Sequence, residues 1–170
     1  MDTIKRNNPG NIRKSGSFKW VGEQPGLKPG AYVIFDTLEN GYRAEIKLLQ
    51  NYVKNGFNTI KKILYRWAPP LDNNPTDGYI KFVSESSGIG KDDVLKPNDA
   101  DSITQIAYFM SRFEHGVKDE DRTLSNVIDG VKKKYFGILD TVARTAQENP
   151  KKTSLLIIAA IGALIYISHE

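Results

Sequence analysis

The chain has 170 residues, of which 39% are hydrophobic and 26% are charged, with a net charge of +4. This ordinary globular composition suits one domain with an appendage, and the absence of cysteine excludes disulfides and thiolate metal sites. With only two histidines besides, we expect no metal and no cofactor, while the modest positive charge suits peptidoglycan, a lipid surface or a nucleic acid without selecting among them.

The first predicted element is a turn-rich segment near the start of the chain. Residues 6–13 read Arg-Asn-Asn-Pro-Gly-Asn-Ile-Arg. Asn and Gly tolerate left-handed backbone, and Pro presets one turn dihedral. The segment is therefore either a structural loop or one wall of a ligand groove, with Asn8 and Asn11 as candidates for hydrogen bonds to a sugar.

A short β-hairpin is expected next. Residues 12–18 would pair with residues 32–35 across a loop, 23–30, that is rich in Pro and Gly. Apolar residues at helical spacing then predict an amphipathic helix that ends at Asn55-Gly56. Asp36 or Thr37 is its expected cap, and Asp36-x-x-Glu39 has the spacing of a capping box.

Three further helices follow in the same domain. The first covers residues 59–66, with Asn58 as its cap, and stops before two prolines. The second covers residues 76–86. The third begins at a cap at residue 101 or 102, carries an apolar face and ends at Glu114-His115-Gly116, where Gly116 suits the position after the helix.

The C-terminal third differs in composition. Residues 119–150 read as an amphipathic helical stalk. Residues 155–167 form an unbroken run of apolar, Gly and Tyr residues, preceded by Lys151 and Lys152. Although a spanning helix needs about 20 apolar residues, flanking Ser, Thr and Lys can extend the run. We therefore expect a single-pass transmembrane anchor over 151–170, in a virion membrane or the host inner membrane.

Residues 6–116 resemble a family of phage and bacterial cell-wall-degrading domains with a lysozyme-like fold. The resemblance rests on an ordered series of short motifs: residues 6–13, Trp20-x-Gly22, Phe35-Asp36-Thr37 with Gly41-x-Arg43-Ala44, Asn51-Tyr52, Thr59-Ile60, Trp67-Ala68-Pro69-Pro70, Tyr79-Ile80 and Phe113-Glu114-His115-Gly116. It implies a mainly α (α+β) lysozyme-like domain over residues 1–118, and virion-associated lysins are common among the phage members.

The motifs also resemble those of bacterial glucosaminidases in a changed order. In those enzymes a Glu-Ser-Gly helix precedes an Asn-Asn segment, whereas here the Asn-Asn segment opens the domain and Glu114-His115-Gly116 closes it. Such a circular permutation is possible when the termini lie close together. It implies that Glu114 takes the place of the catalytic Glu, with His115 where Ser stands in those enzymes.

The residues themselves also support Glu114 as an acid. Cleavage of a glycosidic bond needs a carboxylic acid to protonate the leaving oxygen, and an apolar pocket keeps such an acid protonated. Glu114 ends an apolar helix, where the partial negative charge of the helix terminus also disfavours its ionised form. The alternative is an exposed Glu at a frayed helix end. Glu39 is the second choice, although the capping box already explains it.

Four aromatic residues are candidates to stack on sugars, namely Trp20, Tyr32, Trp67 and Tyr79. Taken singly, Trp67 and Tyr79 fit a hydrophobic core better. Among the remaining carboxylates, Glu23 lies near Trp20 in sequence and Asp72 follows the proline pair.

The sequence therefore predicts cleavage of peptidoglycan glycan strands during phage genome entry or lysis. A lytic transglycosylase is favoured over a muramidase. The alternative is an inactive, membrane-anchored virion structural protein with the same fold. The expected partners are peptidoglycan, a lipid membrane and other virion proteins, with no nucleic acid.

Overall fold

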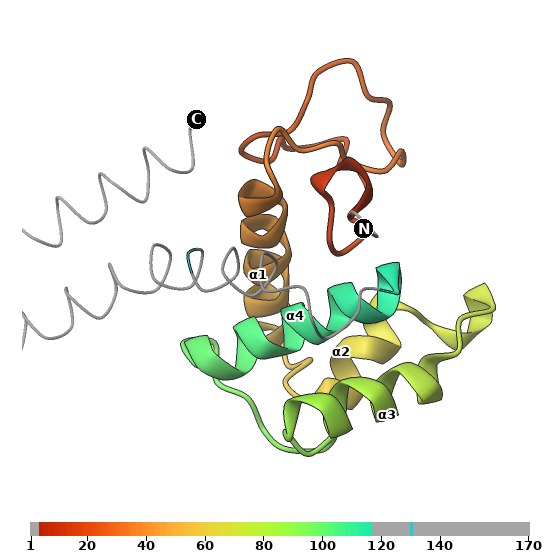
Figure 1. Cartoon of the computed structure of the whole chain (residues 1–170), viewed down its shortest axis with the longest axis vertical. Coiled ribbons are helices and arrows are strands. Elements are labelled where there is room, and N and C mark those ends of the chain that lie inside the picture. The colour runs from red at the N-terminus through yellow and green to blue at the C-terminus, as the bar shows by residue number, and fades with distance from the viewer. Residues whose placement is uncertain (1–3, 117–129, 131–170) are drawn as a thin grey trace, which may run out of the picture.

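The computed structural model describes residues 4–116 and residue 130. The elements in chain order are the 3₁₀ helix η1 (Lys5–Asn7), α1 (Leu38–Lys54), α2 (Ile60–Trp67), the 3₁₀ helix η2 (Pro70–Asp72), α3 (Thr76–Ser87) and α4 (Ala100–His115). α4 packs on α1 and α3, and α2 packs on α3 (Figure 1). An N-terminal segment, residues 4–37, lies beside one end of α1 (Figure 1).

The helices enclose one large apolar core. Its buried side chains come from all four α-helices and include Tyr42, Ile46, Leu49, Ile60, Ile63, Leu64, Tyr79, Val83, Ile103, Ile106 and Met110. A smaller apolar cluster joins the N-terminal segment to α1 through Ile12, Val33, Phe35 and Ala44. Trp67 packs against both clusters, so the end of α2 links the N-terminal segment to the helical core.

The predicted helices are present, with small differences in their caps. The side chains of Thr37, Thr59 and Asp99 cap α1, α2 and α4 by accepting hydrogen bonds from backbone N–H groups in the first turn. The caps predicted at residue 58 and at residues 101–102 are therefore wrong by one to three positions. α4 ends as expected, with Gly116 in the left-handed conformation (φ 64°).

The predicted β-hairpin is wrong. The described residues contain no β-strand and hold only two isolated antiparallel bridges, Arg13 with Tyr32 and Glu23 with Phe35. The pairing stops soon after Lys14 because the chain bends, and the Ser15 hydroxyl accepts a hydrogen bond from the backbone N–H of Ser17 (3.1 Å). The described part of the chain is therefore α-helical with long loops, not α+β.

A buried side chain reinforces the few backbone hydrogen bonds that join residues 12–14 to residues 30–33. Asn8 is 1% exposed, and its Nδ2 donates hydrogen bonds to the carbonyl oxygens of Ile12 and Val33, both at 2.9 Å. Its Oδ1 accepts a hydrogen bond from the backbone N–H of Ile12 (2.8 Å). The side-chain amide of Asn8 thus pairs with backbone groups of Ile12 and of Val33, and it helps to hold these two segments side by side.

Gly41 allows the N-terminal segment to lie directly on α1. A Cβ atom placed there would collide with the carbonyl oxygen of Asn7 and lie 2.7 Å from Cδ of Pro9. Gly41→Ala is therefore expected to lower the free energy of unfolding by about 1–3 kcal/mol, the usual cost of overpacking.

Urea unfolding of Gly41→Ala beside Gly78→Ala checks this prediction. Gly78 lies within α3, and a Cβ there would meet nothing within 4 Å. Because Ala is the better helix former, Gly78→Ala should be neutral or stabilising by up to about 1 kcal/mol. Equal stability of Gly41→Ala and the wild type would contradict the close approach.

The structure does not supply the predicted membrane helix. No helix among the described residues is both long enough and apolar enough to span a bilayer. This finding corrects the expected single-pass anchor and the membrane localisation that depended on it. The segments in question, the stalk at 119–150 and the anchor at 151–170, lie outside the described residues apart from residue 130.

Candidate functional site

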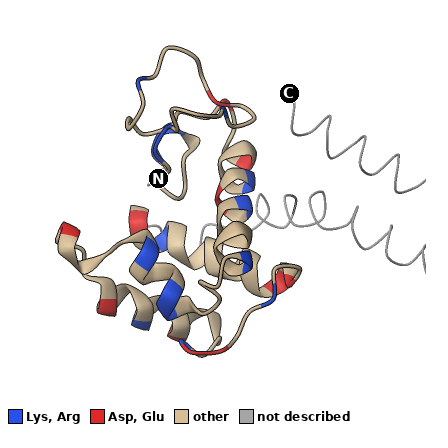
Figure 2. Ribbon diagram, turned by 180° about the vertical axis from the view of Figure 1, so that it is seen from behind, with Lys and Arg blue, Asp and Glu red and all other residues tan. Residues whose placement is uncertain are grey.

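A cleft of about 850 Å³ lies where the N-terminal segment meets the helices. Its lining comes from the N-terminal segment, α1, α2, η2 and the last turn of α4, and consists of Gly10, Asn11, Ile12, Arg13, Ser15, Phe18, Trp20, Tyr32, Leu48, Tyr52, Trp67, Ala68, Asp72, Asn74 and Glu114. This volume is in the range of ligand-binding clefts. Among the described residues, basic and acidic positions are otherwise spread over the N-terminal segment, the helices and the loops (Figure 2).

The carboxylate of Glu114 is held from two sides at the wall of this cleft. Its Oε2 accepts a hydrogen bond from Nδ2 of Asn11 (2.8 Å), and its Oε1 accepts one from the hydroxyl of Tyr79 (3.1 Å). Tyr79 is itself fixed, because it is buried and stacks on Phe113 at 4.0 Å between ring centroids. Its hydroxyl also lies 3.1 Å from the carbonyl oxygen of Met110.

The turn that carries Asn11 is fastened to the end of α4. Nε2 of His115 lies 3.2 Å from the carbonyl oxygen of Asn8 and 3.1 Å from that of Pro9. An N–H at Nε2 can donate to either. Asn11 has left-handed backbone (φ 49°), which Asn tolerates better than most residues. His115 therefore helps to bring Asn11 and Glu114 together across more than 100 residues of sequence.

Aromatic side chains supply much of the remaining cleft surface. Trp20, Tyr32 and Trp67 all line it. Tyr32 is 38% exposed, and one of its faces is covered by the guanidinium group of Arg13, 4.3 Å from the ring centroid. Arg13 also donates a hydrogen bond to the Tyr32 hydroxyl (3.2 Å), so this ring is held in a fixed orientation.

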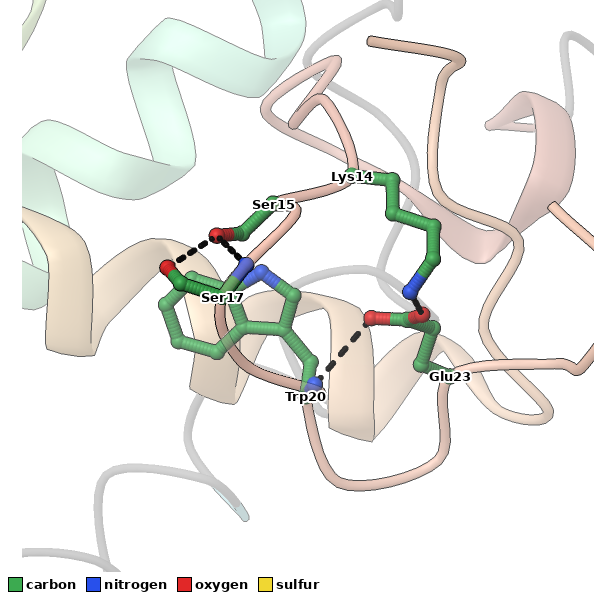
Figure 3. A network of polar contacts seen from close by, with 5 residues as sticks. All are labelled: Lys14, Ser15, Ser17, Trp20 and Glu23. Carbon is green, nitrogen blue, oxygen red and sulfur yellow. Dashed lines mark hydrogen bonds and ion pairs between the residues drawn. The ribbon is translucent and has the colours of Figure 1, made fainter. Parts of the chain in front are cut away.

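The loop that bears Trp20 is anchored by a buried carboxylate (Figure 3). Glu23 is 4% exposed and pairs with the ammonium group of Lys14. Its second oxygen accepts a hydrogen bond from the backbone N–H of Trp20 (3.1 Å). Glu23 is therefore a structural residue that fixes the Trp20 loop, and it does not line the cleft.

The residues predicted from the sequence fall into three groups. Those that meet in the cleft are Asn11, Trp20, Tyr32, Trp67 and Glu114. Asn8 and Tyr79 are buried behind it and act on backbone groups or on Glu114, rather than facing a ligand. Glu39 is exposed on the first turn of α1 and is not part of the lining.

Two further carboxylates bear on the site. Asp72 is exposed in η2 and lines the cleft together with Glu114. The other carboxylate, Glu45, was not identified as a candidate from the sequence.

Within the described part of the chain, no group of three or more His, Cys, Asp or Glu residues is arranged to hold a metal ion.

Glu45 lies in the middle of the buried face of α1. It is fully buried, and neither carboxylate oxygen accepts a hydrogen bond within the described residues. Burial first, and then the negative charge of Glu114, raise its pKa well above the usual range. Glu45 lies three residues after Tyr42 and four residues before Leu49, which places it on the same helical face as these two apolar residues. This spacing was the sequence signal that could have revealed its burial.

Comparison with known proteins connects the chain to a bacteriophage. No protein-family model matches the sequence. Over 95 residues it is 36% identical to Protein P5 of Pseudoalteromonas phage PM2. The match covers 54% of this chain and 59% of Protein P5, so the chain spans little more than half the length of that relative. The chain is thus similar, over about half its length, to a phage protein.

Proposed function

We propose that this chain cleaves the glycan strands of peptidoglycan, with Glu114 as the general acid. The observation that carries the proposal is the Glu114 carboxylate, fixed by Asn11 and Tyr79 at the wall of a cleft lined with aromatic rings. A fixed carboxyl group beside a groove for sugar rings is the minimum that glycosidic cleavage requires. The resemblance of residues 6–116 to cell-wall-degrading domains supports the same assignment.

The chemistry needs only one carboxyl group. Protonated Glu114 gives its proton to the glycosidic oxygen as the bond from C1 to that oxygen breaks, which leaves an oxocarbenium-like sugar and a Glu114 carboxylate. Asn11 and Tyr79 stabilise that carboxylate by donating hydrogen bonds to it. The carboxylate then takes the proton of the sugar's 6-hydroxyl, whose oxygen attacks C1 and closes a 1,6-anhydro ring.

Hydrolysis is the second candidate, because Asp72 also lines the cleft. If Asp72 takes a proton from a water molecule, that water attacks C1 in place of the 6-hydroxyl and leaves a reducing end. The separation of two such carboxyl groups determines whether the configuration at C1 is inverted or retained. We favour the transglycosylase because Asp72 is exposed in the 3₁₀ helix η2, and no hydrogen bond from another described residue fixes its carboxylate as Asn11 and Tyr79 fix that of Glu114.

The similarity to a phage protein suggests where such cleavage would act. A phage must open the cell wall for genome entry and again for release of progeny. We propose that this chain serves one of those two steps, acting on the glycan strands and assembling with other virion proteins.

The proposal is tested by binding of the full chain to insoluble, purified peptidoglycan, with two matched tyrosine variants. Tyr32 and Tyr65 are similarly exposed, at 38% and 41%, but only Tyr32 lines the cleft. Loss of one stacking ring is worth about 1 kcal/mol. Tyr32→Ala is therefore expected to weaken binding about fivefold, while Tyr65→Ala leaves it unchanged. Equal binding by both variants would remove the cleft as the glycan site.

A further inference from the structure

A second, smaller hollow adjoins the cleft along α1. Its volume is about 340 Å³, and its polar and aromatic lining residues are Phe18, Lys19, Trp20, Arg43, Lys47 and Asn51. Phe18 and Trp20 also line the cleft, so the two hollows meet at these rings. On α1, Lys47 lines the smaller hollow and the next residue, Leu48, lines the cleft. We call the smaller hollow the basic pocket.

The basic pocket concentrates positive charge. Among the described residues that line it, three are cations and none is a carboxylate. Arg43 and Lys47 lie four residues apart on one face of α1, a spacing at which like charges destabilise a helix. Burial first, and then the charges of Arg43 and Lys54, lower the pKa of Lys47. An anion in the pocket would offset this repulsion.

The aromatic side of the pocket has a fixed shape. The rings of Phe18 and Trp20 meet edge to face, with their centroids 4.9 Å apart, and Phe18 is 52% exposed. The Glu23 carboxylate accepts a hydrogen bond from the backbone N–H of Trp20 (3.1 Å), which holds the loop that carries both rings (Figure 3). An aromatic wall beside three cations suits a short peptide with carboxylates better than a neutral sugar, because cations form charge-assisted hydrogen bonds with carboxylates.

Peptidoglycan carries such a group beside each glycan strand. Its muramic acid residues bear short peptide stems, whose free C-terminus and acidic side chains are carboxylates, whereas the sugar rings are uncharged. The stems of a strand in the cleft would extend into the space around it, and the basic pocket adjoins the cleft. Continuity with the cleft and complementary charge therefore favour a stem as the occupant of the pocket.

We propose that the basic pocket binds the carboxylates of peptide stems, so that the chain selects glycan strands that bear stems over strands without them. This inference names the substrate of the cleft and rests on the proposed function. Lys47 is the residue that we expect to determine this selectivity, because it is half-buried in the pocket and next to the cleft. Since the pairing is between charges near solvent, it should weaken as the salt concentration rises.

Titration of the ¹⁵N-labelled full chain with a free stem tetrapeptide tests the pocket without any cleavage. The chain has two tryptophans, so two indole N–H signals report on binding by NMR. Trp20 lines both hollows, whereas Trp67 lines the cleft alone. The stem is expected to shift the Trp20 signal and leave the Trp67 signal in place. The same peptide with its carboxylates converted to amides should shift neither signal.

Lys47→Met is expected to weaken stem binding about three- to fivefold, the effect of losing one partly exposed ion pair. Met is of similar length and is a good helix former, so α1 should be retained. Lys54→Met is the matched control, because it removes the same charge from the same helix at an exposed position outside the pocket. Its affinity for the stem should stay within about twofold of the wild type.

Three results would overturn the basic pocket as a stem site. The first is a Trp20 signal that does not move, or that moves equally with the amidated peptide. The second is equal weakening of stem binding by Lys47→Met and Lys54→Met. The third is a response to inorganic phosphate as large as the response to the stem at the same concentration, which would make the pocket a general anion site.

The two proposals fail in different ways. A response of Trp20 to the stem in a folded chain that cleaves no glycan would support the pocket and contradict the proposed function. Equal cleavage of strands with and without stems, in a chain whose Trp20 signal ignores the stem, would support the function and contradict the pocket.

Discussion

Glu114→Gln is expected to reduce glycan cleavage about 10²- to 10⁴-fold, the usual contribution of a general acid. Gln keeps the shape of the side chain, and its one oxygen can still accept a hydrogen bond from Asn11 or from Tyr79, but it has no acidic proton to give to a leaving group. Initial rates of fragment release from purified, dye-labelled peptidoglycan measure the effect. Binding to insoluble peptidoglycan should change little, because the aromatic lining is intact.

Glu39→Gln is the control for this experiment. Glu39 was the second choice for the acid, but it is exposed on the first turn of α1, away from the cleft lining. Its substitution should leave the rate within about twofold of the wild type, a margin that corresponds to about 0.4 kcal/mol. Full activity in Glu114→Gln, or loss of activity in Glu39→Gln alone, would mean that the wrong carboxylate has been assigned.

Asn8→Ala is expected to have the largest effect on stability. It removes three buried hydrogen bonds, two donated to carbonyl oxygens and one accepted from a backbone N–H. The carbonyl oxygen of Ile12 keeps its hydrogen bond from the Val33 N–H, but the other two groups are left unpaired at about 1–3 kcal/mol each, so a loss of roughly 3 kcal/mol or more is expected. For a domain of this size, Tm should fall by more than about 10 °C.

Calorimetry of Asn8→Ala beside Asn51→Ala measures this prediction. Asn51 is exposed on α1, where Ala is the better helix former, so Asn51→Ala should leave Tm within about 2 °C or raise it, consistent with a change below about 0.5 kcal/mol. A similar Tm for both variants would show that the Asn8 amide does not hold the two backbone segments together.

The helical half of the fold could be predicted from the sequence because its signals are local. Three signals each act within a few residues, namely the spacing of apolar residues, the Thr and Asp caps, and Gly116 after the last helix. The helix boundaries predicted from them lie within a few positions of those in the structure. The predicted capping box at Asp36 and Glu39 is wrong, because the neighbouring residue Thr37 caps the helix. The side chain of Asp36 instead accepts a hydrogen bond from the side chain of Asn40 (2.8 Å).

The N-terminal segment was harder to predict because its order depends on distant partners. Two short segments on either side of a Pro- and Gly-rich loop suggested a hairpin, yet only a few backbone hydrogen bonds join them, and the side chain of Asn8 adds three more. No local pattern reveals that the amide of an Asn in a turn-rich run will be buried. The same holds for Asn11, whose partner Glu114 lies 103 positions away.

Part of the candidate site could be predicted from the sequence. The motif resemblance indicated Glu114 and the aromatic residues of the cleft, and the apolar helix that ends at Glu114 supported that residue as the acid. Tyr79 was a candidate for contact with sugar, but its hydroxyl instead reaches Glu114 from the core. Glu45 was overlooked because a charged residue in an amphipathic helix is ordinarily placed on the solvent face.

Mass spectrometry of the fragments that the full chain releases from purified peptidoglycan tests the central claim most directly. The account predicts fragments with cleaved glycan strands, carrying 1,6-anhydromuramyl ends from the wild type and none from Glu114→Gln. Reducing ends in their place would keep the cleavage but assign it to hydrolysis. Intact glycan strands after incubation with folded protein, or fragments released by cleavage of the peptide stems alone, would contradict the account.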